Sequence, residues 1–208
     1  MSTRAYTGEQ KSEKRDRIIA AAENLLSLGR FQLPSINQII QQTGDAKGTV
    51  YLYFKTKEEI YLSLLAQGLE GMMQEMAQLI LRRPENIARD MAKTYIKLAS
   101  ARPKIYYLAC VANLILDSNV SNEFMAAFKS RMLQATNALA DMAVEAGYFP
   151  NQATARTKML VCYNIFLGMW LHTHPQGPVL SVMEENGLTD LIYDFETELC
   201  DCFEKVLE

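Results

Sequence analysis

A chain of 208 residues, 49% of them hydrophobic, can bury one large or two small cores, and its few glycines (10) and prolines (6) favour helices. No apolar run reaches the roughly 18 residues that span a bilayer, and the N-terminal sequence MSTRAYTGEQKSEKRDR has no apolar signal core, so we expect a cytosolic protein without a membrane span. The net charge of −3 hides a division: residues 1–57 carry nine lysines and arginines against five acids, whereas residues 58–208 carry twelve against nineteen, and the basic head predicts an anionic partner.

The first predicted helix covers about residues 12–28, where apolar residues recur at steps of three and four and charged residues occupy the other face. Gly29 is expected to end it. A second, short helix follows Pro34. Ser35 is a natural N-cap for it, and Gln38, three residues later, completes a capping box.

Gly44 is expected to end the second helix, and a third, short helix follows at about residues 46–54. A fourth helix begins after Thr56, with Glu59 as its capping-box partner, and keeps a helical period as far as the sequence RRPEN. A helix, a capped short helix, a glycine turn and a second short helix together predict a helix-turn-helix motif.

The rest of the sequence predicts five further helices, separated by prolines or polar breaks. Their spans are about 86–100, 103–116, 121–146, 151–173 and 188–206. No segment has a sustained strand alternation, and there is no internal repeat. We therefore expect an all-α fold of about nine helices.

In a helix-turn-helix motif the second short helix enters the major groove of DNA, while the first crosses the backbone. Gly48 has no side chain, so the start of this recognition helix can approach DNA closely. Lys47 and Thr49 flank it, within reach of base edges and phosphates. The phenolic hydroxyls of Tyr51 and Tyr53 can donate to phosphate oxygens.

Lys57 stands in the first turn of the fourth helix, where a cation is normally disfavoured. It is best explained by a phosphate that binds there together with the free backbone N–H groups of the helix end. Taken singly, each aromatic can be read as core and the lysine as a solvated charge. Together, on a basic head, they predict DNA binding.

At these residues the sequence resembles a known family. Residues 14–65 are similar to the N-terminal DNA-binding domain of TetR-family transcriptional regulators, in the stretches RIIAAAENLLSLGRF, SINQIIQQTG and KGTVYLYFKTKEEIYLSLL. The resemblance implies a core position for Phe54. It also implies a DNA surface made of Ser35, Lys47, Gly48, Thr49, Tyr51, Tyr53 and Lys57.

Two residues after the turn glycine depart from the family pattern, which commonly has an apolar residue and then a serine. Asp45 and Ala46 stand there instead. Ala46 cannot supply a hydroxyl contact to phosphate. Asp45 is an acceptor near a helix start, so we expect it to cap the recognition helix.

The resemblance implies two domains: a helix-turn-helix DNA-binding domain at residues 1–57, and a helical effector-binding and dimerisation domain at residues 58–208. In the family the last two helices pair with their copies as a four-helix bundle. Both helices carry wide apolar faces here, which favours a dimer interface. The alternative is that these faces pack within one chain. Two recognition helices in a two-fold dimer imply a palindromic DNA operator with half-sites about 34 Å, or a multiple, apart. The apolar residues of the two faces are Met159, Cys162, Tyr163, Phe166, Leu167 and Trp170, and Leu188, Leu191, Ile192, Phe195, Leu199, Phe203 and Val206.

The middle helices combine apolar bulk, flexible methionines and a few polar groups, which suits a pocket for an unknown small-molecule effector, although such stripes are also typical of plain core. Asn113 is the most suggestive member, because a buried amide needs partners. The candidate lining residues are Tyr95, Tyr106, Tyr107, Cys110, Asn113, Met125, Phe128, Met132, Phe166, Met169 and Trp170.

Metal and cofactor sites are not expected. His172 and His174 lie two residues apart and would point to different sides of a helix, without a further ligand nearby. Four cysteines are too few and too irregularly spaced for a disulfide framework, and the pair Cys200 and Cys202 lacks a second pair, so reduced thiols are expected.

The sequence therefore predicts a homodimeric transcriptional regulator, a repressor that a small molecule releases from its operator. The sequence contains neither a Ser or Cys nucleophile motif nor a paired-carboxylate signature, either of which would indicate an enzyme. Two alternatives stay open: an all-helical enzyme or ligand carrier, and an activator or co-repressor-dependent regulator of the same family.

Overall fold

The computed structural model describes residues 8–28, 33–116, 119–175 and 177–208, and within them the chain is all-α, with ten α-helices and no strand. A π-helical turn (Ala112–Leu116) follows α6, and a 3-10 turn (Thr189–Leu191) precedes α10. The helices are α1 (Gly8–Leu25), α2 (Ile36–Thr43), α3 (Lys47–Tyr53), α4 (Lys57–Leu81), α5 (Ile87–Ala101), α6 (Pro103–Val111), α7 (Asn122–Glu145), α8 (Gln152–Thr173), α9 (Pro178–Glu185) and α10 (Phe195–Leu207).

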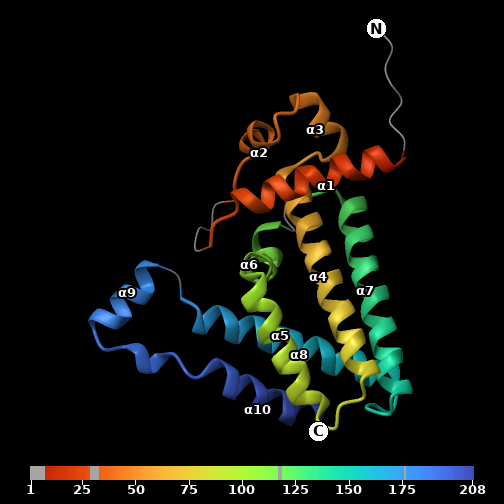
Figure 1. Cartoon of the computed structure of the whole chain (residues 1–208), viewed down its shortest axis with the longest axis vertical. Coiled ribbons are helices and arrows are strands. Elements are labelled where there is room, and N and C mark those ends of the chain that lie inside the picture. Colours follow the sequence, from red (N-terminus) through yellow and green to blue (C-terminus); the bar gives the residue numbers. More distant parts are fainter. Residues whose placement is uncertain (1–7, 29–32, 117–118, 176) are drawn as a thin grey trace.

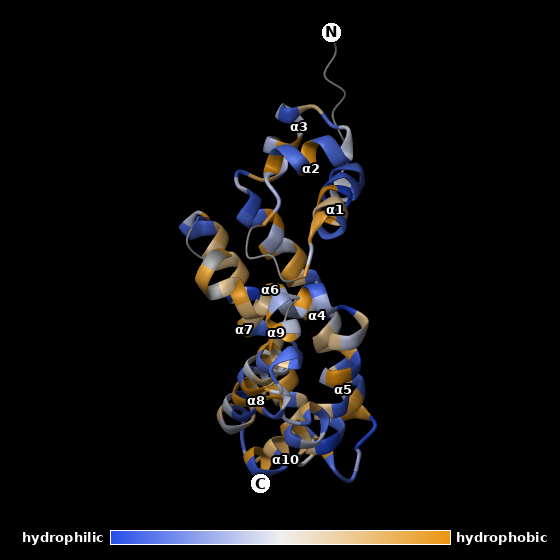
Figure 2. Ribbon diagram, turned by 90° about the vertical axis from the view of Figure 1, so that its left-hand side faces the viewer, coloured by the Kyte–Doolittle hydropathy of each residue, from blue (hydrophilic) through white to orange (hydrophobic). Residues whose placement is uncertain are grey.

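The helices form two parts along the long axis of the molecule (Figure 1). The head consists of α1, α2 and α3, and the body consists of the helices from α5 onwards, with α4 running from one part into the other. Helix α4 packs against α1 in the head and against α5, α6 and α7 in the body, while α10 packs against α5 and α8. Hydrophilic and hydrophobic residues alternate along α1 and α2, as expected of helices with one buried face (Figure 2).

The boundaries of α2 follow the predicted signals, whereas α1 runs from Gly8 to Leu25 and not over residues 12–28. Ser35 caps α2, its hydroxyl accepting from the backbone N–H of Gln38 at 3.3 Å, while the side-chain amide oxygen of Gln38 accepts from the backbone N–H of Ser35 at 2.8 Å. Gly44 ends α2 in the left-handed conformation, with φ at 70°. Both predictions are confirmed, whereas Gly29 lies outside the described residues.

The capping box predicted at the start of α4 is confirmed only in part. Thr56 accepts from the backbone N–H of Glu59 at 3.2 Å, as predicted. The Glu59 carboxylate, however, accepts from the N–H of Lys55 at 2.7 Å. The acid therefore ties the connection from α3 to the first turn of α4.

Helices α4 and α6 approach closely at Gly68. A Cβ placed on Gly68 would overlap Cγ2 of Ile105, whereas a Cβ on Gly71, three residues later, would meet nothing within 4 Å. Glycine normally weakens a helix interior, so the close approach explains its presence at position 68.

The C-terminal region differs from the sequence prediction. An additional helix, α9, occupies residues expected to form a break, since Pro178 stands at its first turn, where proline is tolerated. The last helix begins at Phe195 rather than at residue 188, so Leu188, Leu191 and Ile192 lie before it. Helix α9 has no buried residue and stands away from the bundle (Figure 1).

None of the helices within the described ranges is long and apolar enough to cross a bilayer.

Candidate nucleic-acid interface and effector cavity

Helix α3 presents a short exposed surface at the end of the head. Its core side is anchored by Val50, which is fully buried, and by Phe54 just beyond it, which is 1% exposed. The opposite side exposes Lys47 and Tyr51, with the Lys47 ammonium 5.8 Å from the centre of the Tyr51 ring. Gly48 is exposed and would have open space around a Cβ. The first turn of α3 is therefore exposed on the side away from the core.

The remaining predicted DNA contacts differ in their exposure. Ser35 is exposed at the start of α2, while Thr49 and Tyr53 are half-buried on α3. Lys57 is also half-buried, and its Nζ lies 4.0 Å from a carboxylate oxygen of Glu58. All seven predicted residues thus lie on α2, α3 or the first turn of α4.

Leu52 is an exposed residue of α3 that the sequence prediction omitted. Its side chain is 84% exposed, the largest exposure among the exposed large hydrophobic residues of the described chain. An apolar side chain beside a DNA groove can contact a thymine methyl group. The signal was present in the sequence, because a residue two positions after the core residue Val50 points to the opposite side of a helix.

Asp45 does not cap α3, in contrast to the prediction. The N-cap is Ala46, which makes no side-chain capping bond. Instead the Asp45 carboxylate pairs with two cations of α1: Oδ1 accepts from Lys14 Nζ and, at 2.9 Å, from Arg17 Nη2. The acid therefore links the turn of the helix-turn-helix motif to the first helix.

The surroundings of Asp45 set its charge. Burial alone would raise the pKa of this carboxyl, but the hydrogen bonds from Lys14 and Arg17 outweigh burial and hold the pKa below its ordinary value. The group therefore adds stability above the ordinary pKa of an aspartate, and this stability is lost as the pH falls through the lowered value.

Polar contacts fix the head on the body. Arg15 Nη2 donates to the Ser63 hydroxyl at 2.7 Å, and Gln67 donates to Asp16 at 3.0 Å, both between α1 and α4. The nearly buried carboxylate of Glu58 accepts from Asn119 at 3.2 Å. The start of α4 is thereby tied to the segment between the π-helical turn and α7.

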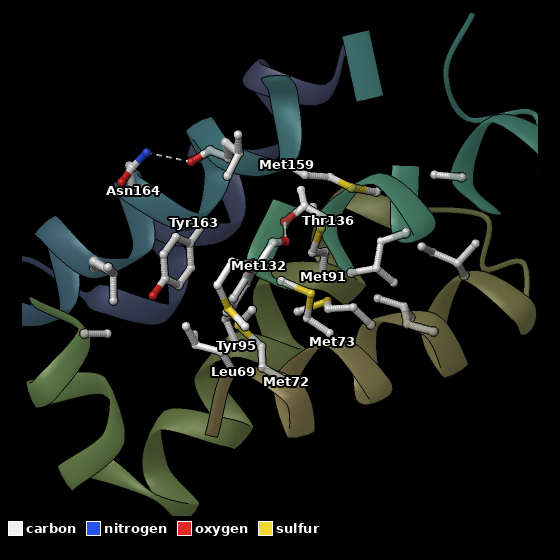
Figure 3. A pocket seen from close by; sticks show the side chains of 18 of the residues that line it. Leu69, Met72, Met73, Met91, Tyr95, Met132, Thr136, Met159, Tyr163 and Asn164 are labelled. Carbon is white, nitrogen blue, oxygen red and sulfur yellow. Dashed lines mark hydrogen bonds between the residues drawn. The ribbon is translucent and has the colours of Figure 1, made fainter. Parts of the chain in front are cut away.

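A cavity of about 280 Å³ lies in the body between α4, α5, α7 and α8. Six methionines contribute to its wall, and the methionines labelled in Figure 3 are gathered around one space. A wall of thioethers and aliphatic groups suits an apolar ligand of adaptable shape. The methionines are Met72, Met73 and Met76 of α4, Met91 of α5, Met132 of α7 and Met159 of α8.

Few polar groups line the cavity. Thr136 uses its hydroxyl to donate to the Met132 carbonyl at 2.8 Å, and Asn164 donates to the Leu160 carbonyl at 2.9 Å (Figure 3). Lys129 and Asn164 are exposed and mark the side of the cavity nearest to solvent. Burial raises the pKa of the Tyr163 phenol, so this group stays neutral and can donate a hydrogen bond.

The structure places the predicted pocket residues in two groups. Tyr95, Phe128 and Met132 line the cavity, whereas the side chain of Asn113 lies outside the described part of the chain. Phe166 stacks on Tyr95 at 4.8 Å between ring centroids, so it lies directly behind the wall. The predicted residues that do not line the cavity are Tyr106, Tyr107, Cys110, Met125, Phe166, Met169 and Trp170.

The two histidines contact different aromatic residues. His172 stacks on Tyr193, with its Nε2 3.0 Å from the Leu191 carbonyl oxygen, whereas His174 stacks on Trp170. Within the described ranges, no three His, Cys, Asp or Glu side chains are grouped as metal ligands would be. The four cysteines are free thiols.

Exposed apolar side chains are concentrated on α8 and on the segment around α9. Leu199 and Phe203 of α10, like Cys162 and Phe166 of α8, are fully buried within the chain, so these members of the two predicted faces follow the alternative of packing within one chain. On α8 the exposed residues follow a helical stripe that includes Gly168. The large apolar members are Leu160, Val161 and Leu171 on α8, Val179 and Val182 on α9, and Leu188, Leu191 and Tyr193 after it.

Comparison with protein families gives a match over nearly the whole chain. Residues 18–64 match the model of bacterial regulatory proteins of the tetR family. Residues 63–208 match the model of the tetracyclin repressor-like C-terminal domain.

Individual relatives agree with these matches. The chain is 26% identical, over 93% of its length and 95% of the relative's, to an uncharacterized HTH-type transcriptional regulator in the lacX 3′ region of Lactococcus lactis. It is 35% identical to the fatty acid metabolism regulator protein of Bacillus subtilis over 100 residues, which are 48% of this chain and 47% of that one.

Solved structures share the fold. The fatty acid degradation regulator FadR from Bacillus halodurans aligns over 92% of this chain and 97% of its own, with a TM-score of 0.59 at 19% identity. A putative TetR-family transcriptional regulator from Syntrophomonas wolfei aligns over 91% and 96%, with a TM-score of 0.54 at 17% identity.

Proposed function

Because the chain belongs to the TetR family of bacterial transcriptional regulators, we propose that it is a homodimeric repressor that leaves a palindromic operator when a small molecule enters the body. In this proposal residues 1–57 read DNA, and residues 58–208 bind the effector and form the dimer. The DNA surface consists of the seven residues on α2, α3 and the start of α4, together with Leu52.

The observation that carries this proposal is the course of α4. The helix begins with Lys57 beside the recognition helix, and its later turns line the cavity with Leu69, Met72 and Met76, among others. Its 25 residues correspond to about 37 Å of continuous helix. A ligand that shifts the cavity end of α4 therefore shifts the head, and two heads that no longer match both half-sites lose the operator.

The DNA part of the proposal is tested by selecting bound duplexes from a random pool. We expect an inverted repeat whose half-sites lie one helical turn, or a multiple, apart. Variants of Lys47 and Thr49, at the tip of α3, should select a changed sequence, because base edges specify the site. Recovery of duplexes without a common sequence would contradict the assignment of a specific regulator.

We propose that the effector is an amphipathic molecule with a long apolar chain and an anionic end, such as a fatty acid. The apolar wall of the cavity supports the chain, and Lys129 on the solvent side offers a cation for the anionic end. Two relatives that carry fatty acid metabolism or fatty acid degradation in their names support the same class.

A matched pair of variants on α7 tests the cavity. Met132 and Met125 are both half-buried methionines packed against the core, but only Met132 lines the cavity. Met132→Trp should abolish the release of DNA by saturated fatty acids while the affinity for DNA is kept, because the larger ring occupies the ligand's space. Met125→Trp should retain the response, and an equal loss in both variants would contradict the location of the site.

The proposed partner surface is the stripe of α8, the penultimate helix of the prediction, with the segment around α9 and the exposed side of α10. Leu160, Val161 and Leu171 support this choice, because contiguous exposed apolar residues usually mark an interface. Since the buried stripe of α10 packs on α5 and α8 of its own chain, α10 would contribute mainly its polar side.

A further inference from the structure

The DNA-binding head contains an acidic residue, Asp45, close to the start of the recognition helix. A carboxylate there would repel the phosphates of bound DNA. Asp45 stands between the end of α2 and the start of α3, two residues before Lys47. Its side chain is only 9% exposed and points back to α1, where it holds both Lys14 and Arg17. Lys14 and Arg17, which contact Asp45, therefore lie close to the first turn of the recognition helix.

The two cations that Asp45 holds lie on α1, beside the turn that leads into α3. Arg17 is 57% exposed, and together with Lys14, Gln10 and Glu13 it lines a shallow polar depression on α1. One guanidinium nitrogen of Arg17 and the ammonium of Lys14 are directed at the same oxygen of Asp45. The carboxylate offsets one of the two positive charges and fixes both side chains toward the turn.

Free cations near the recognition helix would strengthen binding to every duplex, whatever its sequence. Attraction to phosphates is independent of sequence, and each phosphate that a cation neutralises adds about 0.9 to the slope of log affinity against log salt. A regulator gains specificity when this general attraction is limited, because the genome offers very many competing sites.

We propose that Asp45 is a specificity-determining residue, which lowers affinity for non-specific DNA by withholding Lys14 and Arg17 from the phosphate backbone. Asp45 contacts no base in this arrangement and acts through the two cations, so it is a positioning residue. The inference rests on the DNA-binding function proposed above. Asp45, which departs from the family pattern, thus has a role other than capping α3.

A comparison at constant net charge tests the proposal. The variant Lys14→Met/Asp45→Asn removes one positive and one negative charge, and it frees Arg17 alone. The control Lys14→Met/Asp16→Asn has the same net charge, but in it Asp45 still holds Arg17. The amide introduced at position 16 keeps an oxygen that can accept from Gln67. Binding of a random-sequence duplex would be measured by fluorescence anisotropy between about 0.05 and 0.3 M salt, over which phosphate contacts change affinity strongly.

For the Asp45 variant we expect a slope steeper by about 0.9 and an affinity for random duplex about eightfold higher at 0.1 M salt, since one phosphate contact is gained. The control should keep the wild-type slope. Asp45→Asn alone frees two cations and should steepen the slope by about 1.8. The triple variant Lys14→Met/Arg17→Gln/Asp45→Asn should lose this gain.

The outcomes separate the inference from the proposed function. Equal slopes in the Asp45 variant and its control overturn the inference, even if wild-type protein binds DNA with normal salt dependence. No salt-dependent binding by wild-type protein overturns both the inference and the proposed function. Replacing the partly buried Lys14 by an apolar side chain leaves no unpaired ammonium, so the first variant tests the inference even if Asp45→Asn alone does not fold.

Discussion

The head and the body place their candidate functional residues in opposite ways. The head exposes Lys47, Tyr51 and Leu52 on one helix of seven residues, held from behind by Val50 and Phe54. The body instead encloses its candidate site between four helices, and the residues of that site are also part of the hydrophobic core. One site is a surface on a small scaffold, and the other is a space inside the scaffold itself.

Because of this difference, substitutions should have different effects at the two sites. A residue on the exposed surface of α3 can be replaced without opening the core, so its effect should appear in DNA binding alone. A residue of the cavity wall contributes to stability and, in the proposed function, also to ligand binding. Helix α4 belongs to both sites, and in the proposed function it is the element that would carry a change from the body to the head.

The largest expected effect concerns the surface that would join two chains. Val161→Glu/Leu171→Glu places two charges on the exposed stripe of α8, so we expect monomers and a loss of operator affinity of at least about 100-fold, because the second half-site is no longer bound in the same complex. Sedimentation equilibrium and anisotropy with a palindromic duplex measure both. Leu81→Glu, at an exposed leucine at the end of α4, is the control and should remain dimeric.

A smaller effect is expected where α4 crosses α6. Gly68→Ala should destabilise the fold by about 1–3 kcal/mol, because the added methyl overlaps Ile105. Gly71→Ala, in the same helix with open space, should stabilise it by up to about 1 kcal/mol. Urea unfolding of both variants measures the difference, and equal shifts would contradict the described packing of α4 on α6.

The smallest effects distinguish phosphate contact from base contact within the head. Lys57→Ala should weaken binding to all duplexes about eightfold at 0.1 M salt and make the salt slope shallower by about 0.9. Leu52→Ala should keep the slope and relax the preference at one base pair by about 1 kcal/mol, since it removes apolar area only. A changed slope in Leu52→Ala would place this residue against phosphate instead.

The sequence was sufficient for most of the head. Ser35, Gly44 and Thr56 are local signals, each of which determines a helix end through its own backbone neighbourhood, and each stands where it was predicted. Asp45 was interpreted as a cap because its neighbours in sequence suggest one. Its partners, Lys14 and Arg17, lie about 30 residues earlier, and a contact at that distance has no local pattern.

The body was predicted less well for the same physical reason. Aromatic and methionine residues on a helix are visible in the sequence, but which of them face a space and which fill the core depends on how four helices pack. Tyr95 and Met132 line the cavity, whereas Tyr106 and Trp170 do not. Helix α9 does not follow from the sequence pattern, because Pro178 fits a break between helices as well as a first helical position.

The central claim is that the cavity and the DNA surface are coupled through α4, and thermodynamic linkage offers the most direct test. The dissociation constant of a saturated fatty acid would be measured by calorimetry with the free protein and with its complex with the selected operator. Coupling predicts that the operator weakens fatty acid binding by the same factor, about tenfold or more, by which the fatty acid weakens operator binding. Tight fatty acid binding with equal affinity in both states would contradict the account.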